Sequence, residues 1–164
     1  MRVKWLDFDT LKFAARHEGI GLVRGFTFGP DGLLYVCDRG RTRVAAYDPA
    51  TGRYVRDAMD VHDGLEHPIQ AMFTPDGREL LVSDNKADCV WKRDMQTGRV
   101  SRLVEPRSGG LSAASSLAIR GKVLYVGSRL GKQVLKYDLK HGHFLGVFAE
   151  LPSNPEFFVP VSQQ

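Results

Sequence analysis

The sequence predicts an all-β fold built from three copies of one four-stranded unit, and two observations support this prediction. First, the stretch "GPDGLLYVCDRGRTRVAAYDPATGR" at positions 29–53 returns as "TPDGRELLVSDNKADCVWKRDMQTGR" at 74–99, and a third copy, "IRGKVLYVGSRLGKQVLKYDLKHGHF", covers 119–144. Second, the apolar runs within each copy are short, β-branched or aromatic, and bounded by Gly, Pro and Asp turns, as in strands. No helical apolar period extends beyond about two turns.

The spacing of the copies indicates how the units are arranged. Gly52, Gly98 and Gly142 close the same turn, 46 and 44 residues apart. A β-type repeat with a period of roughly 40–50 residues is typical of propeller blades. We therefore expect a β-propeller with about three complete four-stranded blades and a partial blade made from the two chain ends.

Each element of the unit has a local reason. In the first copy we expect strands at 24–28, 33–37, 43–47 and 53–58, and the second and third copies run over 69–104 and 115–148. The Pro-Asp-Gly turns at 30–32 and 75–77 combine a preset proline φ with a glycine that accepts positive φ. Asp48, Asp94 and Asp138 start a second turn, in which the carboxylate bonds backbone amides ahead of it. The innermost strands carry small residues because they converge around an axis: Gly25, Ala71, Ser115 and Ser116.

The two chain ends predict how the single domain, 1–164, is completed. Residues 1–16 match the two outer strands of a blade, and complete blades are expected at 22–60, 66–105 and 111–150. An extra inner strand is expected at 154–162, where Pro155 corresponds to Pro68. Three blades and a fragment leave unpaired edges. Two chains closing one ring of about six to eight blades, a small four-bladed monomer, or an open stack covered by partners would protect them. We favour the homodimer, because isologous pairing buries both edges at once.

Composition restricts the class of protein further. The chain is 43% hydrophobic and 26% charged, which is ordinary for a soluble globular protein. It has no apolar run of the roughly 18 residues that cross a bilayer and no signal-peptide pattern at its start, so we expect a cytoplasmic protein without a membrane partner. Cys37 and Cys89 occupy non-equivalent places in the copies and indicate buried thiols rather than a disulfide framework.

The segments "LYVCDRGRTRVAAYDPATG" and "LLVSDNKADCVWKRDMQTG" resemble NHL-type propeller repeats, of the sort also found in gluconolactonase-like and α-amidating-lyase-like proteins. Such proteins bind RNA, bind proteins, hydrolyse lactones or cleave peptidyl substrates, so the resemblance implies the fold and leaves the function open. Because the sequence has no G-x-S-x-G elbow, P-loop or C-x-x-C motif, our first hypothesis is a binding or scaffold protein that self-associates to close its ring.

Polar residues at the inner strands predict where such a protein binds. Side chains at or near the start of successive inner strands converge on one mouth of an axial channel, which makes it a candidate site for a small ligand or a protein partner. The candidate residues for this channel mouth are Arg24, His67, Gln70, Ser116 and Glu156.

The first alternative is a metal-dependent, lactonase-like hydrolase. The gluconolactonase resemblance implies a divalent cation, calcium or zinc, held by oxygen ligands from Asp84, Asn85 and Glu156, and Asp38 stands at the end of the equivalent strand in the first copy. The competing interpretation is that Asp38 and Asp84 cap the following loop by bonding its amides, which their repetition favours. A lyase would imply several inner histidines, whereas only His67 lies near an inner strand.

The second alternative is an RNA-binding module. Basic residues gather on the loops that follow the second strand of each copy: Arg39, Arg41, Arg43, Lys86, Arg129 and Lys132. Such a patch attracts phosphate. Asp60, Asp63 and Glu66 are expected at the same face and cancel the excess charge, and no ladder of aromatic residues accompanies the basic ones, so nucleic acid is the least favoured partner.

Overall fold

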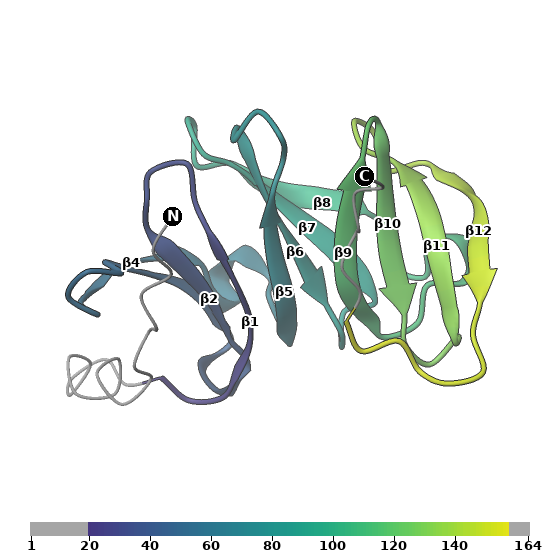
Figure 1. Cartoon of the computed structure of the whole chain (residues 1–164), viewed down its shortest axis with the longest axis horizontal. Coiled ribbons are helices and arrows are strands. Elements are labelled where there is room, and N and C mark those ends of the chain that lie inside the picture. The colour runs from purple at the N-terminus through teal and green to yellow at the C-terminus, as the bar shows by residue number, and fades with distance from the viewer. Residues whose placement is uncertain (1–19, 158–164) are drawn as a thin grey trace, which may run out of the picture.

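A computed structural model describes residues 20–157 as three four-stranded antiparallel sheets that stand side by side, with the first at the left of Figure 1 and the third at the right. In each sheet the strand order follows the chain. The first comprises β1 (Val23–Phe28), β2 (Leu34–Asp38), β3 (Arg43–Tyr47) and β4 (Tyr54–Met59). The second comprises β5 (Pro68–Phe73), β6 (Glu79–Asp84), β7 (Cys89–Asp94) and β8 (Val100–Val104). The third comprises β9 (Ala114–Arg120), β10 (Val123–Ser128), β11 (Gln133–Asp138) and β12 (Phe144–Glu150).

This architecture confirms the predicted all-β, blade-like fold. Short 3-10 turns are the only helical elements in the described residues: η1 (Arg39–Arg41), η2 (Val61–Asp63) and η3 (Ser108–Gly110). None of the helices described between residues 20 and 157 has the length and apolarity to cross a membrane. The fragment expected at 1–16 lies outside the described residues. Of the inner strand expected at 154–162, only 154–157 are described, and they have no regular strand pairing.

The blades are held together by apolar faces that meet between neighbouring sheets. Tyr35 and Met59 of the first blade pack with Leu80 and Trp91 of the second. The opposite face of the second blade supplies Leu81 and other residues to a separate cluster with the third blade. The second blade is therefore buried on both faces, as expected for a propeller blade that stands between two others.

The inner strands β1, β5 and β9 lie next to one another along this arc. Each has a bulge close to its start, so that equivalent positions can be assigned from the register: Pro68 pairs with Asp84 as Ala114 pairs with Ser128. Gly25 touches the second blade so closely that a Cβ there would lie 2.7 Å from the carbonyl oxygen of Ile69. The expectation of small residues on converging inner strands is met at this position.

Both thiols are free and buried, as expected for core cysteines. Burial raises the pKa of the Cys37 thiol, and burial next to Asp84 raises the pKa of Cys89 to about 12. A thiol that stays protonated at neutral pH is a poor nucleophile, so neither cysteine is suited to thiolate chemistry.

The turn aspartates accept backbone amides ahead of them, as the sequence predicted. Asp48 accepts the backbone amides of Ala50 and Thr51 at 2.8 and 3.2 Å, and Asp94 repeats this with Gln96 and Thr97 at 2.9 and 2.7 Å. These hydrogen bonds hold the pKa of both carboxyls below the ordinary value. The turn is therefore fixed by the charged form of the aspartate.

The glycine that closes the third copy of this turn, Gly142, also packs against the neighbouring blade. It adopts φ +72°, and a Cβ there would lie only 1.6 Å from the backbone carbonyl oxygen of Leu103 on β8. By contrast, Gly121 has a similar φ of +60° and open space around the equivalent Cβ position.

We predict that Gly142→Ala destabilises the chain by about 3–4 kcal/mol, because the left-handed backbone and the displaced strand of the second blade both carry a cost. Gly121→Ala is the matched control and costs about 1–2 kcal/mol, for the backbone conformation alone. Urea unfolding measures both values. Equal losses in the two variants would contradict the close contact between the blades.

Candidate ligand-binding site at the inner strands

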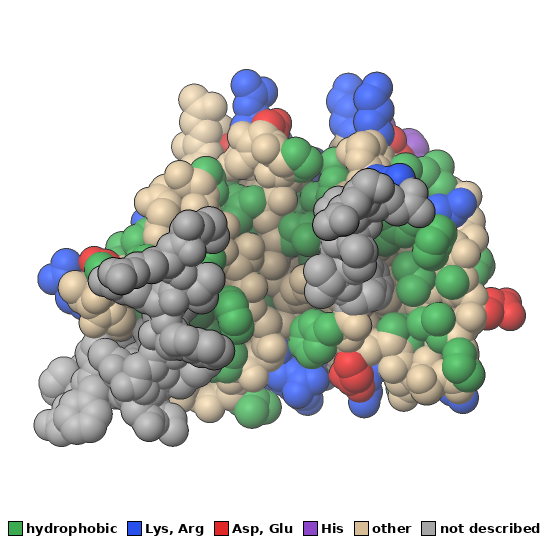
Figure 2. Space-filling view, in the orientation of Figure 1, with side chains coloured by type: hydrophobic (Ala, Val, Ile, Leu, Met, Phe, Trp, Pro, Cys, Tyr) green, Lys and Arg blue, Asp and Glu red, His purple; other side chains and the backbone are tan. Residues whose placement is uncertain are grey.

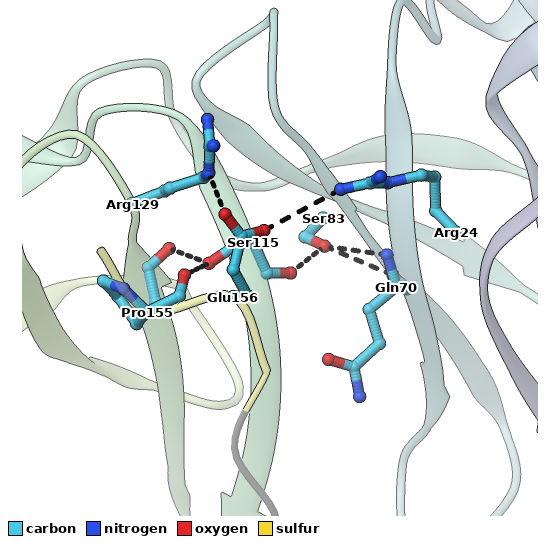
Figure 3. Close-up of polar contacts among 8 residues, drawn as sticks. Arg24, Gln70, Ser83, Ser115, Arg129, Pro155 and Glu156 are labelled. Carbon is cyan, nitrogen blue, oxygen red and sulfur yellow. Dashed lines mark hydrogen bonds and ion pairs between the residues drawn. The ribbon is translucent and has the colours of Figure 1, made fainter. Parts of the chain in front are cut away.

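Three charged side chains from distant parts of the chain meet at the inner strands, and we name them the mouth cluster: Arg24 on β1, Arg129 immediately after β10, and Glu156 after β12 (Figure 3). Glu156 Oε1 accepts a hydrogen bond from Arg129 Nε at 2.6 Å. Its other oxygen, Oε2, lies 3.8 Å from Arg24 Nη2, an ion pair without a hydrogen bond. The side chains are 31% (Arg24), 38% (Arg129) and 47% (Glu156) exposed, so solvent reaches all three.

A repeated contact places Glu156 in this cluster. The hydroxyl of Ser83 on β6 donates to the carbonyl of Ser115, which lies on the inner strand of the next blade. Ser115 in turn donates to the carbonyl of Pro155 at 2.9 Å (Figure 3). Pro155 therefore stands to the third blade as Ser115 stands to the second. The segment 154–157 occupies the place of a fourth inner strand.

This equivalence corrects the alignment made from sequence, which set Pro155 against Pro68. The register makes Pro68 equivalent to Ala114, one residue before Ser115. Pro155 is therefore equivalent to the residue after Pro68 and not to Pro68 itself. The hydrogen bond to its carbonyl defines this position.

In two of the inner segments, the next residue reaches toward another inner strand. Gln70 on β5 bridges to β9: its Oε1 accepts the amide of Leu117 at 2.9 Å, and its Nε2 donates to the Leu117 carbonyl at 3.5 Å. Glu156 occupies the equivalent position in the fourth segment and reaches Arg24 on β1. Side chains at this position therefore link β5 to β9 and the last inner segment to β1.

Ser116 occupies this same position in the third blade and is fully buried, yet its Oγ has no hydrogen-bond partner in the described structure. It lies close to Ser115: a Cβ placed on Gly127 would be 2.6 Å from the Oγ of either serine. Arg24 Nε is likewise enclosed and without a hydrogen-bond acceptor. One group of the mouth cluster, Arg24 Nε, and one buried hydroxyl of the neighbouring inner strand, Ser116 Oγ, therefore have unused hydrogen-bonding capacity.

The channel-mouth residues proposed from the sequence therefore have different roles. Arg24 and Glu156 form an ion pair, Ser116 is buried on β9, and Gln70 is a bridge between blades. His67 uses its backbone amide to bind Asp84, and no contact described for residues 20–157 joins its ring to the mouth cluster. Sequence reasoning assigned Arg129 to a basic surface patch and missed its contact with Glu156. The available signal was its place directly after Ser128, the capping position of the third blade.

Asp84 is a structural cap. It is fully buried, and both carboxylate oxygens accept hydrogen bonds. Five N–H groups contact it within 3.3 Å: the backbone amides of Glu66, His67, Lys86 and Ala87, and the indole of Trp91. The carboxylate ties the chain entering the inner strand to the loop leaving the second strand.

The same tie recurs in the other two blades. Asp38 accepts the amides of Gly21 and Leu22, each at 2.9 Å, and the hydroxyl of Ser128 accepts the amide of Ser112 at 3.0 Å. The repeated residue at the end of the second strand is thus explained by the entry of the inner strand. This geometry supports the capping interpretation of Asp38 and Asp84.

The residues suggested for a divalent cation do not fit one. The oxygens of Asp84 and Asp38 point at backbone amides, and Glu156 is held by two arginines. Asn85 donates its backbone amide to the carbonyl of His67. Within the part of the chain that the structure describes, no group of three or more His, Cys, Asp and Glu residues is placed to hold a metal ion.

The basic loop residues are largely neutralised. Arg43 is only 5% exposed and lies 3.2 Å from Asp57 and 3.7 Å from Asp38. Lys86 pairs with Glu66 at 2.9 Å, and Arg129 pairs with Glu156. Three of the six basic residues expected to attract phosphate thus already face carboxylates.

Comparisons with known proteins agree with this fold. No family model matches the chain. It is 30% identical over 122 residues to NHL repeat-containing protein 3 of Mus musculus, an alignment that covers 65% of this chain and 32% of that protein. The chain thus spans about a third of the length of this curated relative.

Solved structures resemble the chain more extensively. The computationally designed Ika4 protein has a TM-score of 0.65 at 16% identity, and the match covers 89% of this chain and 84% of Ika4. A protein described as a candidate gluconolactonase has a TM-score of 0.70 at 19% identity, with 82% of this chain and 52% of the other covered. Virginiamycin B lyase from Staphylococcus aureus gives 0.64 at 13% identity, covering 84% and 45%. At these identities the likeness shows the fold alone.

The stacked four-stranded sheets and these structural matches define a β-propeller repeat protein. Its repeats resemble those of the mouse NHL repeat-containing protein in sequence.

We predict that Asp84→Ala destabilises the chain by about 3 kcal/mol, because four partly buried backbone amides and the buried Trp91 indole lose their acceptor. Asp76→Ala, at an exposed turn, is the control and causes a smaller loss. Thermal unfolding with and without millimolar calcium completes the test, and we expect no calcium-dependent shift in either variant or in the unmodified chain. A calcium shift that Asp84→Ala abolishes would contradict the capping assignment and restore the metal site.

Proposed function

We propose that this chain is a propeller-type binding module that holds a small ligand or a protein partner at the mouth cluster. The observation that carries the proposal is the convergence of Arg24, Arg129 and Glu156 from three separate elements onto one solvent-accessible place at the inner strands. Convergent polar groups held by a rigid scaffold are the usual starting point for a ligand site. The backbone around them is fixed by the repeated caps and bridges.

An unused hydrogen-bonding group adds support. A buried polar group without a partner costs about 1–3 kcal/mol, so proteins keep few of them. Arg24 Nε is such a group and belongs to the mouth cluster. A ligand that offers an acceptor to Arg24 would recover part of this free energy.

Self-association of two copies stays a prediction, to be checked by the particle mass in solution. Exposed apolar side chains on β12 support it: Leu145 is 52% and Phe148 61% exposed. Figure 2 shows hydrophobic side chains gathered over the third blade, at the right of the view. The contact of Glu156 with Arg24 supports the other expected route, in which a single chain closes a four-bladed ring.

No described feature favours the two alternative functions over the binding module. A lactonase-like hydrolase would need cation ligands, whereas the oxygens of Asp38 and Asp84 are engaged by backbone amides. An RNA-binding face would need available positive charge, and half of the expected basic residues are paired.

The proposal predicts where a ligand perturbs the chain. In a nuclear magnetic resonance screen of small metabolites, amide shifts are expected at Arg24, Ser116 and Arg129. The internal control is a groove on the second blade, lined by Glu79, Lys92, Asp94, Thr97, Arg99 and Ser101, where no shifts are expected. Shifts confined to this groove, or a library without any hit at the mouth cluster, would argue against the proposed site.

A further inference from the structure

We propose that the mouth cluster is a carboxylate-binding site and that Glu156 occupies it as an internal competitor. The ligand would place its carboxylate between Arg24 and Arg129, where the Glu156 carboxylate now lies (Figure 3). This inference rests on the proposed binding function and adds the chemical class of the ligand.

The first argument is the balance of charge and donors. Two guanidinium groups face one carboxylate, so the cluster has a formal charge of +1. Each guanidinium has five N–H donors. Glu156 accepts one hydrogen bond from Arg129, while its distance of 3.8 Å to Arg24 is too long for a second. Arg24 is therefore left with donors that a better-placed carboxylate can engage in pairs.

The second argument is that Arg24 holds Glu156 only weakly and that the main chain at this segment is held independently of the Glu156 side chain. Ion pairs between side chains that are a third to a half exposed are screened by water and contribute little to stability. The Arg24 pair, at 3.8 Å and without a hydrogen bond, belongs to this class. A ligand carboxylate can therefore displace the side chain without unfolding the segment, because the hydrogen bond from Ser115 to Pro155 holds the backbone independently.

The third argument is that the charge at this position is not required by the fold. At the equivalent place in the second blade, the neutral Gln70 makes a complete bridge by donating to and accepting from the backbone of Leu117. A carboxylate cannot donate, so Glu156 cannot copy that bridge and instead recruits cations.

The carboxylate can come from a free organic acid or from an acidic peptide, and the test separates these sources. Succinate and a blocked tetraglutamate peptide are titrated into the whole chain at low ionic strength, with amide shifts of Arg24 and Arg129 as the readout. Binding of both probes indicates a free-acid site, whereas binding of the peptide alone indicates a peptide site. Either result supports carboxylate recognition.

Glu156→Gln removes the competitor and is expected to bind the probes about fivefold more tightly than the unmodified chain, equivalent to about 1 kcal/mol. Glu150→Gln is the matched control, because it removes an exposed carboxylate at the end of β12 and leaves the mouth cluster intact. Its affinity should equal that of the unmodified chain. The double variant Arg129→Gln/Glu156→Gln should lose the gain in probe affinity that Glu156→Gln alone produces.

Equal affinities in the unmodified chain and in Glu156→Gln would overturn the proposal, as would probe binding that survives the loss of Arg129. If Glu156→Gln fails to fold, Glu156→Asp replaces it, since the shorter carboxylate withdraws from Arg24 and the same tightening is expected. Neutral compounds that bind at the mouth cluster while succinate and the peptide do not would refute carboxylate recognition and leave the binding function standing.

Discussion

The whole structure depends on the burial of apolar side chains between neighbouring sheets. A four-stranded sheet with apolar residues on both faces cannot be stable alone in water, because one face at least stays exposed. The second blade meets this requirement through the cluster around Tyr35 and Trp91 on one side and the cluster around Leu81 and Leu124 on the other. The sequence repeats because each blade must bury its apolar faces against neighbouring blades of the same kind.

Hydrogen bonds then fix the positions of the inner strands, which apolar burial alone does not determine. Asp38, Asp84 and Ser128 fasten each incoming inner strand by its amides. Hydroxyl-to-carbonyl hydrogen bonds join the second blade to β9, from Ser83, and β9 to the segment that contains Pro155, from Ser115. The site follows from this arrangement, since the residue after Pro155 is delivered to a place between the first and the third blade.

Much of the fold could be predicted because its determinants are local. Turn residues such as Asp48 and short apolar runs act over a few positions. They can therefore be recognised in a single sequence. The capping role of Asp84 was also predictable, because the residue recurs at a fixed place. The pairing of Arg129 with Glu156 was not, since it joins residues 27 apart through the curvature of the blades. The place of Pro155 was not predictable either, because it is defined by a hydrogen bond from Ser115, which lies 40 residues earlier in the chain.

The most direct test of the central claim is hydrogen exchange in a variant that weakens one contact between blades. Leu124 on β10 is fully buried in the cluster shared by the second and third blades. Leu124→Ala should lower the protection of amides on β6 and β7 as well as on β10 and β11, each by about 2–4 kcal/mol. Loss of protection confined to the third blade, with the second unchanged, would contradict the account that burial between the blades holds the fold together.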